Sequence, residues 1–134
     1  MKKEIIICIV VIAIVIIGNS LTQNNTKNSV SELNGSLEDL KHSLINVVKS
    51  ERGNKIQTYK DKSVEIRDRW DEMQEILSFY IEHDELEKVE TQLAVVEGQM
   101  KGKLYDEAIA EIEKCQFILE HIADKTAFNI KNIF

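Results

Sequence analysis

The chain of 134 residues is long enough for one small domain after any targeting segment. It contains no proline and only five glycines, and 30% of its residues are charged, a profile that favours long helices over sheets. The formal net charge of −6 argues against a nucleic-acid partner, because phosphate binding requires clustered lysine and arginine.

The N-terminus carries an apolar run that predicts a membrane segment. Lys2 and Lys3 precede thirteen uninterrupted apolar residues at positions 5–17, and nearly every face of a helix built from this run is apolar. Thirteen helical residues extend over ~20 Å, which is shorter than the ~30 Å hydrocarbon core of a bilayer. The length therefore fits either a signal anchor that stays in the membrane or a signal peptide that is removed.

We favour an uncleaved signal anchor over residues 1–20, with local thinning of the bilayer absorbing the mismatch in length. The alternative is cleavage after Ser20, because Gly18 and Ser20 are small residues of the kind that signal peptidase recognises. Both interpretations place the rest of the chain outside the cytoplasm, and the positive-inside rule keeps Lys2 and Lys3 on the cytoplasmic side. Since no second apolar run of this length follows, the prediction is a single-pass protein of the cell membrane.

A polar linker is expected over residues 21–28, ahead of an extracytoplasmic helical domain over residues 29–134. The stretch NSLTQNNTKN at positions 19–28 is rich in asparagine and other polar side chains, which are common in connections. Its ten residues reach ~33 Å if extended and about 15 Å if they continue the preceding helix. The sequence leaves both conformations open.

Apolar residues after position 29 recur at steps of three and four, in four successive sets. This spacing places each set on one face of a helix, and no comparable stretch shows the period of two that is typical of strands. Gly53-Asn54 separates the first set from the second, and Gly102 separates the third from the fourth. Because short connections make neighbouring helices antiparallel, the prediction is an all-α, coiled-coil-like up-down bundle of about four helices. The four sets are Val30, Leu33, Leu37, Leu40, Leu44 and Val47; Ile56, Tyr59, Ser63, Ile66, Trp70, Met73, Leu77 and Tyr80, in which only Ser63 is polar; Leu86, Val89, Leu93, Val96 and Met100; and Leu104, Ala108, Ile112, Cys115, Leu119 and Ile122.

The connection between the second and third helices falls in the acidic stretch FYIEHDELEKVE, residues 79–90. Asp84 and Glu87 have the spacing of a capping box, in which the Asp84 side chain accepts hydrogen bonds from the open amides of the new helix. We therefore predict a helix–helix turn that is capped by Asp84. The surrounding charges are polarised: residues 52–69 hold six basic and three acidic residues, net +3, whereas residues 71–97 hold nine acidic residues and one basic, net −8.

Several segments together resemble one bacterial family. A basic start and a short apolar run are followed by a helix containing Trp70, then by YIEHDELEKVE, FILEHIADK and the ending NIKNIF. They resemble an uncharacterised family of short, N-terminally membrane-anchored helical proteins from Gram-positive, spore-forming bacteria, which is known only as a domain of unknown function. The resemblance implies a single-pass, all-helical protein and brings no activity or cofactor with it. Its most specific pieces are Trp70, Glu82-His83, Glu120-His121 and Asn132-Ile133.

Six residues are the candidates for an interaction site. In an up-down bundle the second and fourth helices run parallel, so the two Glu-His pairs emerge at the same end, close to the membrane. Histidines and carboxylates gathered there can bind a divalent metal, but their spacing matches no recognised ligand set. We therefore expect these side chains to cap helices and form hydrogen bonds, and we predict no metal or cofactor. The tryptophan lies on an apolar face, where core packing is expected. The candidates are Trp70, Glu82, His83, Asp84, Glu120 and His121.

The chain lacks the motifs of common enzymes, because it has neither a Gly-rich phosphate loop nor a Gly-x-Ser-x-Gly elbow. Cys8 and Cys115 lie far apart along the chain, so no disulfide is expected, and Cys115 fits the core as a small apolar side chain. We expect a non-enzymatic, membrane-tethered interaction or structural module with a protein partner. The alternative is a divalent-cation-binding or sensor domain that uses the acidic, membrane-proximal end.

Overall fold

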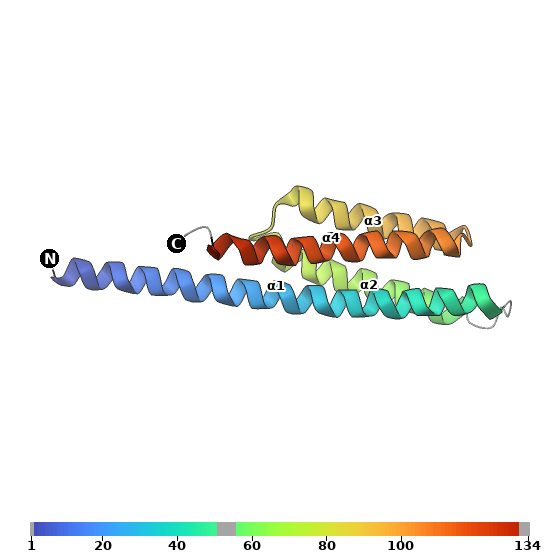
Figure 1. Cartoon of the computed structure of the whole chain (residues 1–134), viewed down its shortest axis with the longest axis horizontal. Coiled ribbons are helices and arrows are strands. Elements are labelled where there is room, and N and C mark those ends of the chain that lie inside the picture. Colours follow the sequence, from blue (N-terminus) through green and yellow to red (C-terminus); the bar gives the residue numbers. More distant parts are fainter. Residues whose placement is uncertain (1, 51–55, 132–134) are drawn as a thin grey trace.

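The computed structural model describes residues 2–50 and 56–131, with side chains at 3–49 and 59–126. Four helices cover these ranges and run alternately up and down (Figure 1). No strand occurs within these ranges, so the predicted all-α bundle of four helices is confirmed. The turn expected at Gly53-Asn54 lies outside the described residues. The helices are α1 (Lys2–Ser50), α2 (Ile56–Leu77), α3 (His83–Lys101) and α4 (Tyr105–Lys131).

The helices surround one shared core in which each contacts its neighbours along the chain. α1 packs against both α2 and α4, and α3 packs against α4, whereas α2 packs only loosely on α3. Only part of α1 belongs to the bundle, because its 49 residues far exceed the 22 of α2 and the 19 of α3. Its N-terminal part extends beyond the other helices, at the end where α4 finishes (Figure 1).

The core is built from the predicted apolar faces. Each large apolar side chain of the four sets that the structure describes is buried or partly buried, except Leu104, which is 50% exposed. Leu104 precedes the first residue of α4, and the first fully buried residue of that helix is Ala108. Burying a large apolar side chain contributes roughly 1.5–3 kcal/mol, and this contribution is the main force that holds the four helices together.

α1 continues without interruption through residues 19–28, so the helical alternative for the expected linker is the one the structure shows. Some of its polar side chains already make contacts in the bundle. The Gln23 side-chain amide donates a hydrogen bond to the Thr126 carbonyl at 3.1 Å. Thr26 is fully buried, and its hydroxyl lies 3.3 Å from that of Tyr80. Packing of α1 against α4 and the end of α2 therefore begins inside the expected linker.

The predicted Asp84 cap is wrong, because α3 begins earlier than expected. Its N-cap is Glu82, which has an extended backbone and makes no side-chain capping bond. The Glu82 carbonyl accepts the amides of Glu85 at 3.0 Å and Leu86 at 3.4 Å, which starts the helix two residues before Asp84 can act as a cap. Asp84 lies in the first turn, where its negative charge interacts favourably with the positive end of the helix dipole and contributes only a few tenths of a kcal/mol.

The turn predicted at Gly102 is confirmed, but Gly102 does not adopt the left-handed conformation. Gly102 has φ of −76°, and the next residue, Lys103, has φ of 61°. The Lys103 amide donates to the Met100 carbonyl at 3.1 Å, and the Leu104 amide donates to the Gln99 carbonyl at 2.9 Å. This pair of bonds is the Schellman arrangement that closes a helix C-terminus, with a lysine in the position that usually carries glycine.

Candidate functional site

A chain of polar contacts joins α2 to α3 along the loose seam between them. Arg67 on α2 donates from Nη1 to Glu90 Oε1 at 2.6 Å and from Nε to Glu97 Oε1 at 2.9 Å. The other oxygen of Glu90 accepts the indole N–H of Trp70 at 2.7 Å. Trp70 is fully buried, as its place on the apolar face predicts, and its one polar atom is satisfied by this carboxylate.

The guanidinium of Arg67 stays charged in this position. Partial burial alone would lower the pKa of Arg67, but the hydrogen bonds and charges of Glu97 and Glu90 outweigh that effect and raise the pKa above its ordinary value. An arginine engaged by two carboxylates from α3 is a directional connection between the two helices. It compensates for the sparse apolar contact along this seam.

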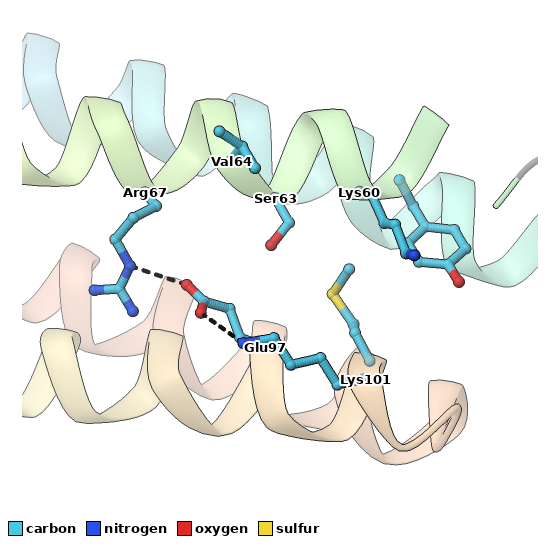
Figure 2. Close-up of a pocket in the computed structure, with 8 residues that line it drawn as sticks. Lys60, Ser63, Val64, Arg67, Glu97 and Lys101 are labelled. Atoms are coloured by element: carbon cyan, nitrogen blue, oxygen red, sulfur yellow. Dashed lines mark hydrogen bonds and ion pairs between the residues drawn. The ribbon is translucent and has the colours of Figure 1, made fainter. Parts of the chain in front are cut away.

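A cleft of about 400 Å³ opens beside this network, towards the end of the bundle that lies away from the N-terminus of α1. Figure 2 shows Arg67 and Glu97 at one end of the cleft, with the Ser63 side chain pointing from α2 into the space between the helices. The cleft exists because Ser63 interrupts the apolar face of α2, where every neighbouring core position carries a larger side chain. Its lining residues are Tyr59, Lys60, Ser63, Val64, Arg67, Glu97, Met100 and Lys101.

A tyrosine pair lies at the other end of the cleft. The hydroxyls of Tyr59 and Tyr105 are 2.9 Å apart, and their rings meet edge to face with centroids 5.5 Å apart. Burial, followed by the hydrogen bond to Tyr105, raises the pKa of Tyr59 to about 12. The phenol of Tyr59 therefore remains neutral and holds α2 against the start of α4.

The acidic end of the bundle does not gather the two Glu-His pairs into one site. His83, Asp84, Glu120 and His121 are exposed. Glu82 contacts Lys125 instead, at 3.2 Å. Throughout the part of the chain that the structure describes, no three His, Cys, Asp or Glu side chains lie close enough together to hold a metal ion. The alternative of a cation-binding end therefore gains no support from the arrangement of these residues.

A lysine connects α4 to the start of α3 at this end. Lys125 lies between Glu82 and Glu85, at 3.2 Å and 3.4 Å respectively. Glu85 is only 8% exposed, and the hydrogen bond from Lys88, together with that from Lys125, holds the pKa of Glu85 below its ordinary value. These contacts give Glu82 and Glu85 a structural role at the α2–α3 turn.

Most residues of the α2–α3 seam were not predicted from the sequence. Arg67, Glu90 and Glu97 were not among the candidate residues, although two signals were present. Arg67 precedes Trp70 by three residues, and Glu90 precedes Glu97 by seven, so each pair lies on one helix face next to a buried stripe. Ser63 was recognised as the polar member of the second apolar set, but its consequence, an open cleft, depends on what α3 places opposite.

The fold and the site together define an up-down bundle of four helices, whose first helix extends into an apolar N-terminal segment and whose second and third helices flank a charged cleft. The chain belongs to the family described as Domain of unknown function (DUF4363), which matches residues 21–133. The match begins just after the apolar run and includes the polar segment of α1 as well as the bundle. Neither curated proteins nor solved structures provide a match to the chain. The uncharacterised family predicted from the sequence is thus confirmed at this level.

Proposed function

We propose that this protein is a single-pass protein of the bacterial cell membrane whose bundle lies outside the cytoplasm and binds a protein partner without catalysing a reaction. The observation that carries the proposal is the continuity of α1, which leads from an uncovered apolar segment into the bundle core as a single helix. A helix of this kind is a rigid tether, because every backbone hydrogen bond across the polar segment is retained.

The apolar part of α1 supports the membrane assignment. Its Ile and Val side chains at positions 5–17 are between 49% and 63% exposed, and no other part of the described chain covers them. The helix is long and apolar enough to cross a membrane, by length and composition. Exposed apolar area of this size is unfavourable in water, and a lipid bilayer would cover it. Lys2 and Lys3 favour a cytoplasmic N-terminus.

The charged groups at the α2–α3 seam support binding over catalysis. Arg67, Glu90 and Glu97 already satisfy one another, and Trp70 uses the remaining oxygen of Glu90. Groups engaged in this way position two helices and do not act as free acids, bases or nucleophiles. A tethered bundle with an open cleft away from the membrane presents that surface to molecules outside the cell.

Cysteine labelling of intact cells tests the topology. In a Cys8→Ser background, Glu87→Cys places a thiol on an exposed position of α3, and Lys3→Cys is the matched control at the N-terminus. A membrane-impermeant maleimide should label Glu87→Cys in intact cells, and Lys3→Cys only after lysis. The reverse pattern, or protection of both until lysis, contradicts the proposed topology. Release of the bundle into the medium without its apolar segment would instead identify cleavage after Ser20.

Cross-linking tests the partner. A photo-reactive residue at exposed Val64, beside the cleft, should yield one discrete adduct with a protein in native membranes. The matched control is the same residue at Phe117, which is also exposed but lies on α4. A single adduct from Val64 alone supports a specific interaction. Identical ladders of adducts from both positions indicate random collision and contradict the partner proposal.

A further inference from the structure

The cleft between α2 and α3 is a break in an otherwise continuous core. Tyr59, Ile66 and Trp70 on the same face of α2 are each no more than 3% exposed, whereas Ser63 contributes only a hydroxymethyl group between the helices. A larger apolar side chain at this position would fill the space and stabilise the bundle, as cavity-filling substitutions often do. A local departure from good packing of this kind is a common feature of binding sites.

The hydroxyl of Ser63 is available to a ligand. Serine hydroxyls in helices usually donate to the carbonyl four residues earlier, as Ser36 does to Glu32 at 3.3 Å and Ser43 does to Asp39 at 2.8 Å. Within the described part of the chain, the Ser63 hydroxyl has no such partner and points into the cleft (Figure 2).

The charge around the cleft is positive although the whole chain is negative. Lys60, Arg67 and Lys101 line the cleft against the single carboxylate of Glu97. Arg67 is held by Glu90 and Glu97, and Lys101 makes only a long contact of 3.8 Å with Glu97. In the described ranges, Lys60 has no ion-pair partner. Lys60 is thus the cation of the lining whose ammonium is free to meet an anion at the rim, and Lys101 adds a second, weakly paired positive charge beside it.

We propose that the cleft binds a small amphiphilic carboxylate. Its apolar part lies between Tyr59 and Met100, and its carboxylate meets the Ser63 hydroxyl inside the cleft and the Lys60 ammonium at the rim. The volume of about 400 Å³ falls within the range of roughly 300–1,000 Å³ that is typical of small-molecule sites. The positive rim disfavours a cation, and a neutral amphiphile leaves the Lys60 ammonium unpaired. The inference goes beyond the proposed function and does not depend on the membrane topology.

Trp70 provides an internal reporter of occupancy. It is the one tryptophan of the chain, and its indole N–H is bonded to the same Glu90 carboxylate that holds Arg67 at the wall of the cleft. A carboxylate bound at Lys60 and Ser63 adds a negative charge beside the Arg67–Glu90 ion pair, and so changes the electrostatic environment of the indole that donates to Glu90. The fluorescence of Trp70 therefore responds to binding even though the ring itself is fully buried.

The test is a fluorescence titration of the full chain, held in nanodiscs of zwitterionic lipid, with sodium octanoate. The parent protein should show a saturable change in Trp70 emission. Ser63→Leu, which fills the cleft, should weaken binding by about tenfold or more, and so should the combined Lys60→Gln and Lys101→Gln variant. The matched control is Lys114→Gln, because Lys114 is an exposed α4 lysine paired with Glu111 at 2.6 Å. It should bind like the parent.

Parallel titrations with octanol and octyltrimethylammonium separate a site from partitioning into lipid. Binding of either probe with the same affinity as octanoate overturns the proposal, as does a change that rises without saturation. Unchanged octanoate binding in Ser63→Leu also overturns it. If Ser63→Leu does not fold, the lysine variant decides: retained binding contradicts the proposed site, and lost binding alongside a normal Lys114→Gln control supports it.

Discussion

The indole nitrogen of Trp70 lies 2.7 Å from Oε2 of Glu90, so the one tryptophan of the chain joins the core to the polar seam between α2 and α3. Oε1 of the same carboxylate accepts from Arg67 at 2.6 Å. Trp70, which the apolar pattern places in the core, is thus also the hydrogen-bond donor that orients the Arg67–Glu90 ion pair. This arrangement links the packing of α2 to the charge distribution at the cleft.

Removing this acceptor should destabilise the bundle. Glu90→Ala leaves the buried indole N–H and the guanidinium of Arg67 without their shared partner, at a cost of about 1–3 kcal/mol. That loss corresponds to a fall of several degrees in the melting temperature of a domain of this size. The control is Glu87→Ala, an exposed carboxylate on the same helix, which should change stability by less than about 0.5 kcal/mol. Thermal melts followed by circular dichroism measure both, and equal shifts would contradict a structural role for Glu90.

A charge placed in the core of α3 should unfold the bundle. Leu93 is 3% exposed, so Leu93→Asp buries a carboxylate with no partner and costs several kcal/mol, a large part of the stability of a small domain. Gln92 is not a neutral comparison, because its amide donates to the Glu111 carbonyl at 3.2 Å. Thr91 is exposed, and Thr91→Asp should be tolerated. Similar melts for the two variants would refute the assignment of the buried face.

Asp84 should be replaceable with little effect, since it makes no cap. We expect Asp84→Ala to cost less than about 0.5 kcal/mol through its weakened interaction with the helix dipole. A loss of ~1 kcal/mol or more would restore the capping interpretation. The measurement is the same thermal melt, compared with Asp84→Asn, which removes the charge but retains a capping oxygen.

The turn between α3 and α4 can be stabilised by one substitution. Lys103 has φ of 61°, a conformation that glycine adopts without the steric cost paid by side chains. Lys103→Gly should therefore stabilise the bundle by about 1 kcal/mol. Gly102→Ala is the matched comparison, because Gly102 is not left-handed and an added Cβ would meet its nearest atoms at 3.5 Å, an ordinary contact. Destabilisation by Lys103→Gly would show that the lysine side chain has another role.

Stability should fall in alkaline solution through two buried groups. Burial raises the pKa of Cys115 from 9.0 to about 12, and burial with the Tyr105 hydrogen bond raises the pKa of Tyr59 from 10.0 to about 12. Both stay protonated in the folded state while the unfolded chain ionises, so stability declines as pH rises above about 9. Melts between about pH 8 and about pH 10.5 should show this decline. Tyr59→Phe and Cys115→Ala should each reduce the slope, and an unchanged slope in both variants contradicts this origin.

The local architecture could be predicted well because its signals are local. Steps of three and four placed Leu37, Trp70 and Leu119 on buried faces, and each is fully buried. Gly102 correctly indicated a turn. A Schellman turn requires one residue in the left-handed conformation, and that residue is the neighbouring Lys103. The predicted Asp84 cap was wrong because the same spacing of acidic residues also occurs inside the first turn of a helix that begins earlier.

By itself, the sequence determined that this protein is helical, which face of each helix is buried, and that an apolar segment precedes the bundle. These properties depend on residues three or four positions apart, which are neighbours in any helix. Only the tertiary structure decided that Trp70 meets Glu90, that the polar segment of α1 packs near Thr126, and that α2 and α3 leave a cleft at Ser63. A repeating apolar stripe allows two helices to slide past each other by one turn while burying a similar area. The contacts of each side chain are therefore determined by the register that all four helices adopt together.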